Sequence, residues 1–169
     1  MEDLVFEVQY ENPFIEACYN GDLTKAKEFL HQGFDINAKA ESGSAALHIA
    51  AQNGYVEMVD FLIQKKADVN LTTDDGLTAL HFAAIRGYLE IVSSLIEAKI
   101  DLDIAGRRYN RTALHYAADK NKIDVVRILI EAGANPDLLD ILGFSPLKIA
   151  SSKNNFDVAN AILTSKPRY

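Results

Sequence analysis

Three histidines are the residues of this chain whose type and spacing could most readily support chemistry. His48, His81 and His115 stand 33 and 34 residues apart, and imidazole side chains act as zinc ligands and as general acids and bases. One zinc ion needs ligand atoms about 2 Å away, whereas stacked repeating units separate equivalent residues by about 10 Å. The spacing therefore excludes a shared metal. The periodicity predicts instead that each histidine forms hydrogen bonds within a local turn and ties adjacent units together.

The other reactive groups also lack the partners that catalysis requires. Cys18 has no histidine at a fixed local spacing, and it aligns with Ala51 and Ala84, which predicts a small packed thiol. The carboxylates occupy repeated positions at helix starts or lie on predicted exposed loops, so the spacing implies no converging pair. A glycine-rich phosphate loop and a serine-centred elbow are both absent from the sequence. We therefore predict that the protein is not an enzyme and has no catalytic residues, metal or cofactor.

The segments that position these residues repeat five times. Three copies of one step read LHIAA at 47–51, LHFAA at 80–84 and LHYAA at 114–118, and weaker copies read FIEAC at 14–18 and LKIAS at 147–151. A glycine or asparagine and a helical apolar pattern follow each step. Four units then close with GFDIN at 33–37, KADVN at 66–70, KIDLD at 99–103 and GANPD at 133–137. Each unit is predicted to be a short helix, a tight turn, a second helix and an extended finger.

Local signals support this division into two helices per unit. Thr78 and Thr112 are predicted to cap the free amides of their helices, Ser145 is able to do so, and Ala45 is not. The small alanine pairs allow neighbouring helices to approach to about 8–10 Å. One unit cannot bury its apolar face alone, whereas five stacked units share a continuous core. The second helices begin with carboxylates that complement the helix dipole: Glu57, Glu90, Asp124 and Asp157.

The segment 75–92 resembles an ankyrin repeat nearly position for position, and the resemblance covers roughly residues 10–165. It implies an all-α repeat solenoid, an ankyrin-repeat stack of helix pairs with β-hairpin fingers at about a right angle and a concave face. We expect one ankyrin-repeat domain over 1–169. Its expected parts are an acidic extension at 1–9, repeats at about 10–37, 38–70, 71–103, 104–137 and 138–165, and a tail at 166–169.

The sequence departs from the repeat pattern at several places. Lys66 and Lys99 replace the glycine that precedes the finger, and a left-handed lysine costs about 1 kcal/mol. The fourth unit has one extra residue between Asp103 and Thr112, so we expect its finger to bulge. The first and last units are more polar at helix positions, as end units facing water must be.

The net charge of −7 is unevenly distributed. Residues 1–24 hold six acids and no lysine or arginine, whereas residues 25–169 hold 18 acids and 17 bases. Neither region offers the basic stripe of a typical nucleic-acid binder, so no nucleic acid is expected as a partner. For the acidic end we weigh a recruiting arm against a segment that folds back through its apolar residues. We favour the second reading, on Leu4, Val5, Phe6 and Val8.

The resemblance implies that variable positions at finger tips and on the concave helix faces bind a partner. The finger at 138–144 has five large apolar residues, and the finger before it has three arginines and a tyrosine. Such a patch is typical of an interaction hot spot, although Leu138 and Leu142 could simply pack on the C-terminal cap. The predicted partner-binding residues are Leu77, Ile85, Arg86, Arg107, Arg108, Tyr109, Arg111, Asp119, Lys120, Leu139, Ile141, Leu142 and Phe144.

The resulting functional prediction is a non-catalytic module that binds, masks or inhibits another protein, as a monomer or within a hetero-complex. The alternative is a regulator acting on nucleic acid or transcription, directly or through a subunit, which salt-dependent nucleic-acid binding would reveal. No apolar run of 18 residues occurs, so membrane insertion is not expected. The acidic start favours the cytoplasm, with the nucleus or secretion into a host cell as alternatives. Asn37 and Asn70 also resemble the ankyrin targets of an asparaginyl hydroxylase.

Overall fold

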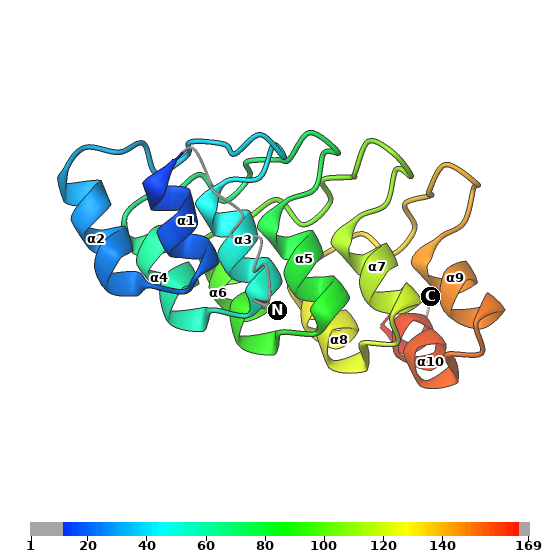
Figure 1. The fold of residues 1–169 in the computed structure, drawn as a ribbon. Coiled ribbons are helices and arrows are strands. Elements are labelled where there is room, and N and C mark those ends of the chain that lie inside the picture. The colour runs from blue at the N-terminus through cyan, green and yellow to red at the C-terminus, as the bar shows by residue number, and fades with distance from the viewer. Residues whose placement is uncertain (1–11, 166–169) are drawn as a thin grey trace, which may run out of the picture.

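The computed structural model describes residues 12–165, which form two layers of helices with a row of fingers along one side (Figure 1). The predicted fold-back of Leu4, Val5, Phe6 and Val8 lies outside these residues. The first layer consists of α1 (Pro13–Tyr19), α3 (Ala46–Asn53), α5 (Ala79–Arg86), α7 (Ala113–Asp119) and α9 (Pro146–Ser152). The second layer consists of α2 (Leu23–His31), α4 (Val56–Gln64), α6 (Leu89–Glu97), α8 (Ile123–Glu131) and α10 (Phe156–Thr164).

Two first-layer helices, α5 and α7, begin with a reciprocal threonine–histidine cap. The hydroxyl of Thr78 lies 2.9 Å from Nδ1 of His81, and the N–H of Thr78 donates to the same nitrogen at 3.0 Å. Thr112 and His115 repeat this arrangement. The prediction that these histidines form hydrogen bonds within their local turns is therefore confirmed, because each imidazole reaches back over the first turn of its helix. Ser145 caps α9 as predicted, by accepting a hydrogen bond from the N–H of Lys148 at 3.3 Å.

A continuous apolar core lies between the two layers. It includes the alanine pairs of the first-layer helices, whose side chains are buried, together with the apolar faces of the second-layer helices. Acidic residues occupy the first turns of α4, α6, α8 and α10, as predicted. The short alanine side chains allow α3, α5, α7 and α9 to pack side by side, so each unit is buried by its neighbours.

The fingers are tight hairpins without regular strands. Within residues 12–165 the only β-bridge pairs Lys39 with Ala45. The hairpins are numbered here by the repeat that they introduce, so the second, third, fourth and fifth begin the repeats at 38–70, 71–103, 104–137 and 138–165. The second, third and fifth hairpins are each closed by a backbone bond that spans four residues, such as the bond from the N–H of Thr73 to the oxygen of Leu77. The corresponding bond of the fourth hairpin runs from Gly106 to Arg111 and spans five residues. The expected bulge in the fourth finger is therefore confirmed.

Both lysines that replace the glycine before a finger adopt the left-handed conformation. Lys66 has a φ of 69° and Lys99 a φ of 65°, at the turns that lead from α4 and α6 into the fingers. The equivalent turns after α2 and α8 contain Gly33 and Gly133, which adopt this conformation without a Cβ penalty.

A ladder of side-chain bonds joins the bases of successive fingers. Oδ1 of Asn37 accepts from the N–H of Asp68 at 2.9 Å, and Oδ1 of Asn70 accepts from the N–H of Asp101 at 2.8 Å. A third bond of this kind connects Asp103 with the N–H of Asn135. Each bond joins one unit to the next, so the closing signature of the repeat has a structural role.

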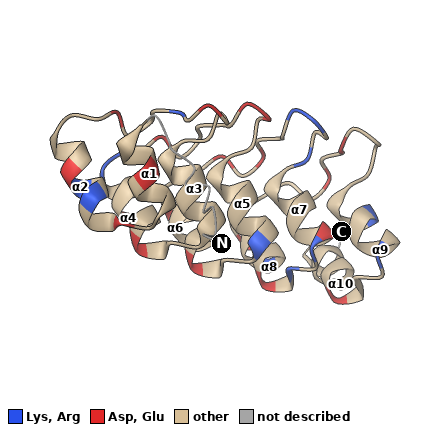
Figure 2. Ribbon diagram, viewed as in Figure 1, with Lys and Arg blue, Asp and Glu red and all other residues tan. Residues whose placement is uncertain are grey.

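Charge is polarised along the stack. Residues 12–103 carry 14 acidic and seven basic side chains, whereas residues 104–165 carry six acidic and eight basic ones. In Figure 2 the third finger carries acidic residues and the fourth carries basic ones, while the second carries both signs, Lys39 and Glu41. The near-neutral average over residues 25–169 thus conceals an acidic end and a mildly basic end.

Candidate functional site

The three histidines connect α3, α5 and α7 to the finger that follows each helix. Because a backbone N–H donates to Nδ1 in each, that nitrogen is unprotonated and Nε2 carries the hydrogen. Nε2 then donates to the oxygens of Leu71, Arg111 and Phe144 at 2.7, 3.1 and 3.2 Å. This confirms that the histidines tie adjacent units together.

Burial keeps these histidines neutral. Loss of solvation lowers the pKa of all three and brings the pKa of His81 to about 4. Among residues 12–165, no three side chains of the histidine, cysteine, aspartate or glutamate type gather where they could hold a metal ion.

Cys18 is the packed thiol that its alignment with alanine predicted. Its side chain is fully buried, and Sγ lies 4.0 Å from Sδ of Met58. Burial raises the pKa of the Cys18 thiol to about 12, so the nucleophilic thiolate form is not populated at neutral pH.

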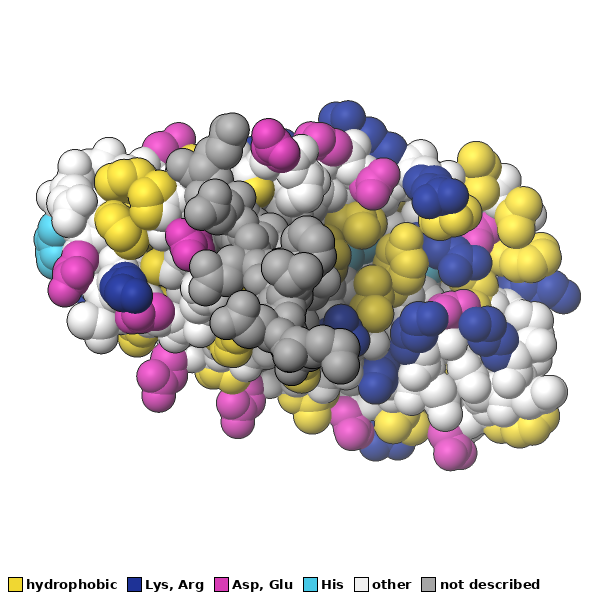
Figure 3. Space-filling view, in the orientation of Figure 1, with side chains coloured by type: hydrophobic (Ala, Val, Ile, Leu, Met, Phe, Trp, Pro, Cys, Tyr) yellow, Lys and Arg dark blue, Asp and Glu magenta, His cyan; other side chains and the backbone are white. Residues whose placement is uncertain are grey.

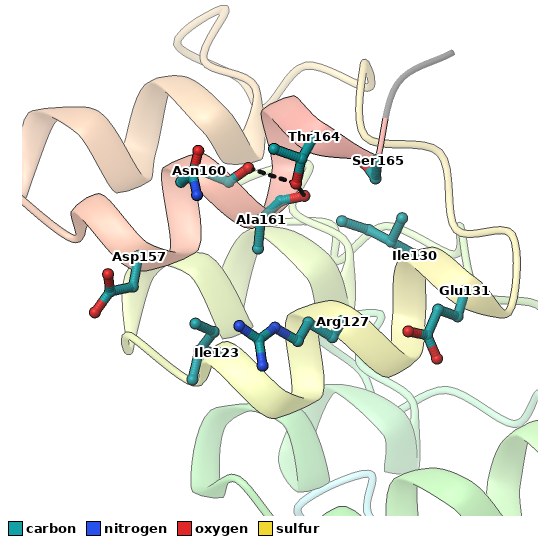
Figure 4. Close-up of a pocket in the computed structure, with 9 residues that line it drawn as sticks. All are labelled: Ile123, Arg127, Ile130, Glu131, Asp157, Asn160, Ala161, Thr164 and Ser165. Carbon is teal, nitrogen blue, oxygen red and sulfur yellow. Dashed lines mark hydrogen bonds between the residues drawn. The ribbon is translucent and has the colours of Figure 1, made fainter. Parts of the chain in front are cut away.

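An open groove lies between α8 and α10 in the second layer (Figure 4). Its two carboxylates, those of Asp157 and Glu131, lie at opposite ends of the groove, and Arg127 lies between them. The dashed bonds in this view are those of the Thr164 hydroxyl to the oxygens of Asn160 and Ala161. No acid–base pair therefore converges in this groove.

The fourth and fifth finger tips form one continuous surface, here called the tip surface: Arg107, Arg108, Tyr109, Leu139, Ile141 and Leu142. The N–H of Ile141 donates to the oxygen of Tyr109 at 2.9 Å. Nδ2 of Asn110 donates to the oxygen of Leu139, also at 2.9 Å. These two bonds hold the arginine-bearing tip and the apolar tip in fixed register.

The apolar part of the tip surface is unusually exposed. Leu139, Ile141 and Leu142 are 53%, 65% and 69% exposed. The guanidinium group of Arg108 lies 5.2 Å from the ring centre of Tyr109, within cation–π range. Figure 3 shows dark blue and yellow side chains side by side at this end of the molecule. The combination of exposed leucine, isoleucine, tyrosine and arginine is typical of binding hot spots.

Asp140 lies beneath this surface and fixes its shape. The side chain is only 5% exposed, and its Oδ1 accepts from the N–H groups of Leu142 and Phe144 at 2.9 and 3.0 Å. Its Oδ2 accepts from Nε of Arg111 at 3.0 Å. Burial opposes ionisation of Asp140, but the bonds from Phe144, Arg111 and Leu142 outweigh it and lower the pKa of the carboxyl. The ionised carboxylate therefore joins the two fingers.

A second charged cluster lies between α7 and α9. Asp119 is within 3.7 Å of Arg111, 3.3 Å of Lys120 and 2.7 Å of Lys153. Although partial burial opposes it, the bonds from Lys153 and Lys120 lower the pKa of Asp119. Arg111, Asp119 and Lys120 thus lie in an ion-pair network, which leaves less of their charge available to a partner.

The remaining predicted residues lie apart from the tip surface or beneath it. Leu77 is half-buried between fingers, against Gly106. Phe144 is half-buried, and its backbone is held by His115 and Asp140. Ile85 is half-buried and Arg86 exposed, both on α5. Sequence reasoning overlooked the roles of Asp140 and Asn110. The Asp-x-x-Gly pattern at 140–143 was the available signal, because aspartate often accepts bonds from its own turn.

Comparison with known proteins agrees with this architecture. The family model described as ankyrin repeats, three copies, matches residues 14–106 and again residues 101–168. The chain belongs to the ankyrin-repeat family. Ankyrin repeats are generally protein–protein interaction modules. Within residues 12–165, no helix is long and apolar enough to cross a membrane.

The similar proteins each match only part of this chain. Ankyrin repeat domain-containing protein 46 of Rattus norvegicus is 40% identical over 50 residues, which is 30% of this chain and 22% of that protein. Myotrophin of Xenopus tropicalis is 38% identical over 55 residues, 32% of this chain and 47% of that protein. The Arf-GAP with ANK repeat and PH domain-containing protein cnt-1 of Caenorhabditis elegans is 48% identical over 48 residues, 28% of this chain and 6% of that protein. The chain thus spans less than half the length of these relatives.

Proposed function

We propose that this ankyrin-repeat protein is a non-catalytic interaction module that holds, masks or inhibits a protein partner through its fingers and adjoining helix faces. The observation that carries the proposal is the tip surface, where three exposed apolar side chains lie beside two arginines and a tyrosine on hydrogen-bonded fingers. Such pre-organisation favours binding, because less side-chain and loop freedom is lost on association.

The reactive groups described above support the non-catalytic part of the proposal. The histidines are neutral and have both ring nitrogens engaged, and Cys18 is a buried thiol. In the same proposal the protein acts in the cytoplasm, alone or in a hetero-complex.

Different predicted residues have different roles in this proposal. The tip surface supplies the direct anchors, while Arg111 and Phe144 position them through Asp140. Additional partner contacts come from first-layer helices and the third finger, through Leu77, Ile85, Arg86, Asp119 and Lys120.

Affinity capture with matched variants tests the proposal. The tagged chain is exposed to lysate of its source organism as wild type, as Ile141→Ser/Leu142→Ser, and as the control Phe156→Ser/Leu163→Ser on α10. The control removes two apolar side chains of similar exposure, 70% and 55%, far from the tips. We expect at least one captured protein to be lost with the tip variant and retained with the control. Retention of every captured protein by the tip variant would overturn the proposal.

A further inference from the structure

We infer that the tip surface binds an acidic, apolar segment of a partner protein. In this arrangement one or more partner carboxylates meet Arg107 and Arg108, and a large apolar side chain packs on Leu139, Ile141 and Leu142. The inference rests on the proposed function and adds the chemistry of the partner to it.

Within the described part of the chain, the two tip arginines have no carboxylate partner. Among residues 12–165 no acidic oxygen lies within 4.0 Å of either guanidinium, in contrast to Arg111, Lys120 and Lys153, which pair with aspartates. Nη1 of Arg107 makes only a 3.4 Å bond to the oxygen of Asp74, and Arg108 lies over the Tyr109 ring. A guanidinium group matches a carboxylate with two parallel hydrogen bonds. Arg107 and Arg108 are therefore available for an acidic ligand.

The backbone that carries these arginines is firmly held. The N–H of Arg107 donates to the oxygen of Asp75 at 2.7 Å, and the Tyr109 oxygen accepts from Ile141. The third and fifth fingers thus hold the fourth from both sides. Long arginine side chains lose freedom on binding, but the fixed backbone limits that loss.

The neighbouring finger tips set the position and direction of the bound segment. The third finger exposes Asp74 and Asp75, which repel partner carboxylates, while the second finger exposes both Lys39 and Glu41 (Figure 2). The fifth finger offers apolar contacts, and its carboxylate, that of Asp140, is buried and paired with Arg111. The segment therefore places its apolar residue over the fifth finger and its acidic residue over the fourth.

The repeat geometry also sets the spacing within the segment. Each hairpin consists of two backbone segments, and such segments pack about 4.8 Å apart, so neighbouring hairpin tips are separated by about 10 Å. An extended segment advances about 3.3 Å per residue. The apolar and acidic residues of the partner are therefore about three positions apart.

Three labelled synthetic peptides of equal length test this chemistry. The first alternates leucine and glutamate at the three-residue spacing, the second replaces each glutamate with lysine, and the third replaces each leucine with serine. Fluorescence anisotropy with the full chain measures binding. We expect the first peptide to bind at least about tenfold more tightly than the other two, and Arg107→Glu/Arg108→Glu to reverse the preference toward the lysine peptide. The control Lys65→Glu/Arg127→Glu makes the same charge change on second-layer helices and leaves the preference intact.

Several results would overturn the inference. They are equal binding of the glutamate and lysine peptides, no binding of the glutamate peptide, or an unchanged preference in Arg107→Glu/Arg108→Glu. Tighter binding of a single-stranded oligonucleotide than of the glutamate peptide would assign the arginines to nucleic acid instead. In lysate capture, a protein lost with Ile141→Ser/Leu142→Ser but kept with Arg107→Glu/Arg108→Glu would leave the proposed function standing and reject only the acidic partner.

Discussion

His81 and Asp140 are both buried and polar, yet their surroundings hold them in opposite protonation states. The partners of His81 suit the neutral ring, because Nδ1 receives an N–H and Nε2 donates to a carbonyl. The partners of Asp140 are all donors, namely two backbone N–H groups and one guanidinium. Burial therefore keeps His81 neutral, whereas hydrogen-bond donors outweigh burial and keep Asp140 ionised, and each side chain fixes a finger in place.

The histidines make the fold sensitive to mild acid. The pKa of His81 is about 4 in the folded chain and about 6.5 in an unfolded one. Between these values the unfolded state binds more protons, so stability is complete above about pH 6.5 and falls as the pH approaches 4. At pH 5, His81 alone reduces the free energy of unfolding by about 2 kcal/mol relative to pH 7. Urea denaturation at both pH values measures this loss.

A His81 variant separates this effect from general acid destabilisation. His81→Asn keeps an acceptor near Thr78 but does not titrate. It should be less stable at pH 7 and lose less stability between pH 7 and pH 5 than wild type. An equal loss in the two proteins would show that His81 does not carry the pH dependence.

Removing the Asp140 carboxylate should cost more than removing the equivalent hydroxyl of the third finger. Asp140→Ala leaves two N–H groups and Arg111 without their acceptor, with an expected loss of about 2 kcal/mol or more. Thr73→Ala removes the bond from the N–H of Leu77 to Oγ1 of Thr73, at 3.2 Å, with an expected loss of about 1 kcal/mol. Chemical denaturation of both variants at pH 7 compares the two. Equal losses would contradict the idea that Asp140 joins two fingers.

At the scale of elements, periodicity predicted most of the architecture and little of the fine structure. The repeated steps led to the helix pairs, the bulged fourth finger and the left-handed lysines. The partner of Asp140 was not predictable, because Arg111 lies 29 residues away and only stacking brings the two together. The bonds of the histidines within their local turns were predictable, because these residues recur with the period of the repeat.

The left-handed lysines allow a direct test of backbone strain at the turns that follow α4 and α6. Lys66→Gly should raise the free energy of unfolding by about 1 kcal/mol, because glycine accepts a φ of 69° without steric penalty. For a chain of this size that corresponds to a rise of about 2–4 °C in melting temperature. The adjacent Lys65 has a φ of −81°, so Lys65→Gly should lower the melting temperature. A higher melting temperature in both variants, or in neither, would argue against relief of backbone strain at Lys66.

Two glycines of nearly equal φ isolate the contribution of finger stacking. Gly76 has a φ of 77° and Gly143 a φ of 76°. A Cβ at Gly76 would lie 2.9 Å from the backbone nitrogen of Arg107, whereas nothing lies within 4 Å of a Cβ at Gly143. Gly76→Ala should therefore be less stable than Gly143→Ala by about 1–3 kcal/mol. Equal melting temperatures would show that neighbouring fingers readily move apart.

At the scale of the whole molecule, stability is distributed along a line. Within residues 12–165 each helix pair packs on the pairs before and after it, and the first and last of these pairs have one packed side each. The last helix leaves Phe156 and Leu163 exposed, at 70% and 55%. In such stacks the total stability is approximately a sum of unit and interface contributions.

Hydrogen exchange should reveal this arrangement. Backbone amides of α5 and α7 should exchange more slowly than those of α1, α2, α9 and α10, because opening a central unit breaks two interfaces and opening an end unit breaks one. Mass spectrometry of peptic fragments at neutral pH measures the difference. Equal protection throughout residues 12–165 would indicate that the stack opens only as a single unit.

The separation of acidic and basic side chains along the stack gives residues 12–165 an electric dipole. Residues 12–103 have seven more acids than bases, and residues 104–165 have two more bases than acids. A dipole experiences a torque near a charged surface, so a negatively charged body approaching this protein turns the end that carries the fourth and fifth fingers toward itself. At physiological ionic strength the Debye length is about 8 Å, so this alignment acts only when the two surfaces are separated by about that distance or less. Added salt should therefore slow productive encounters more than it shortens the life of a complex once formed.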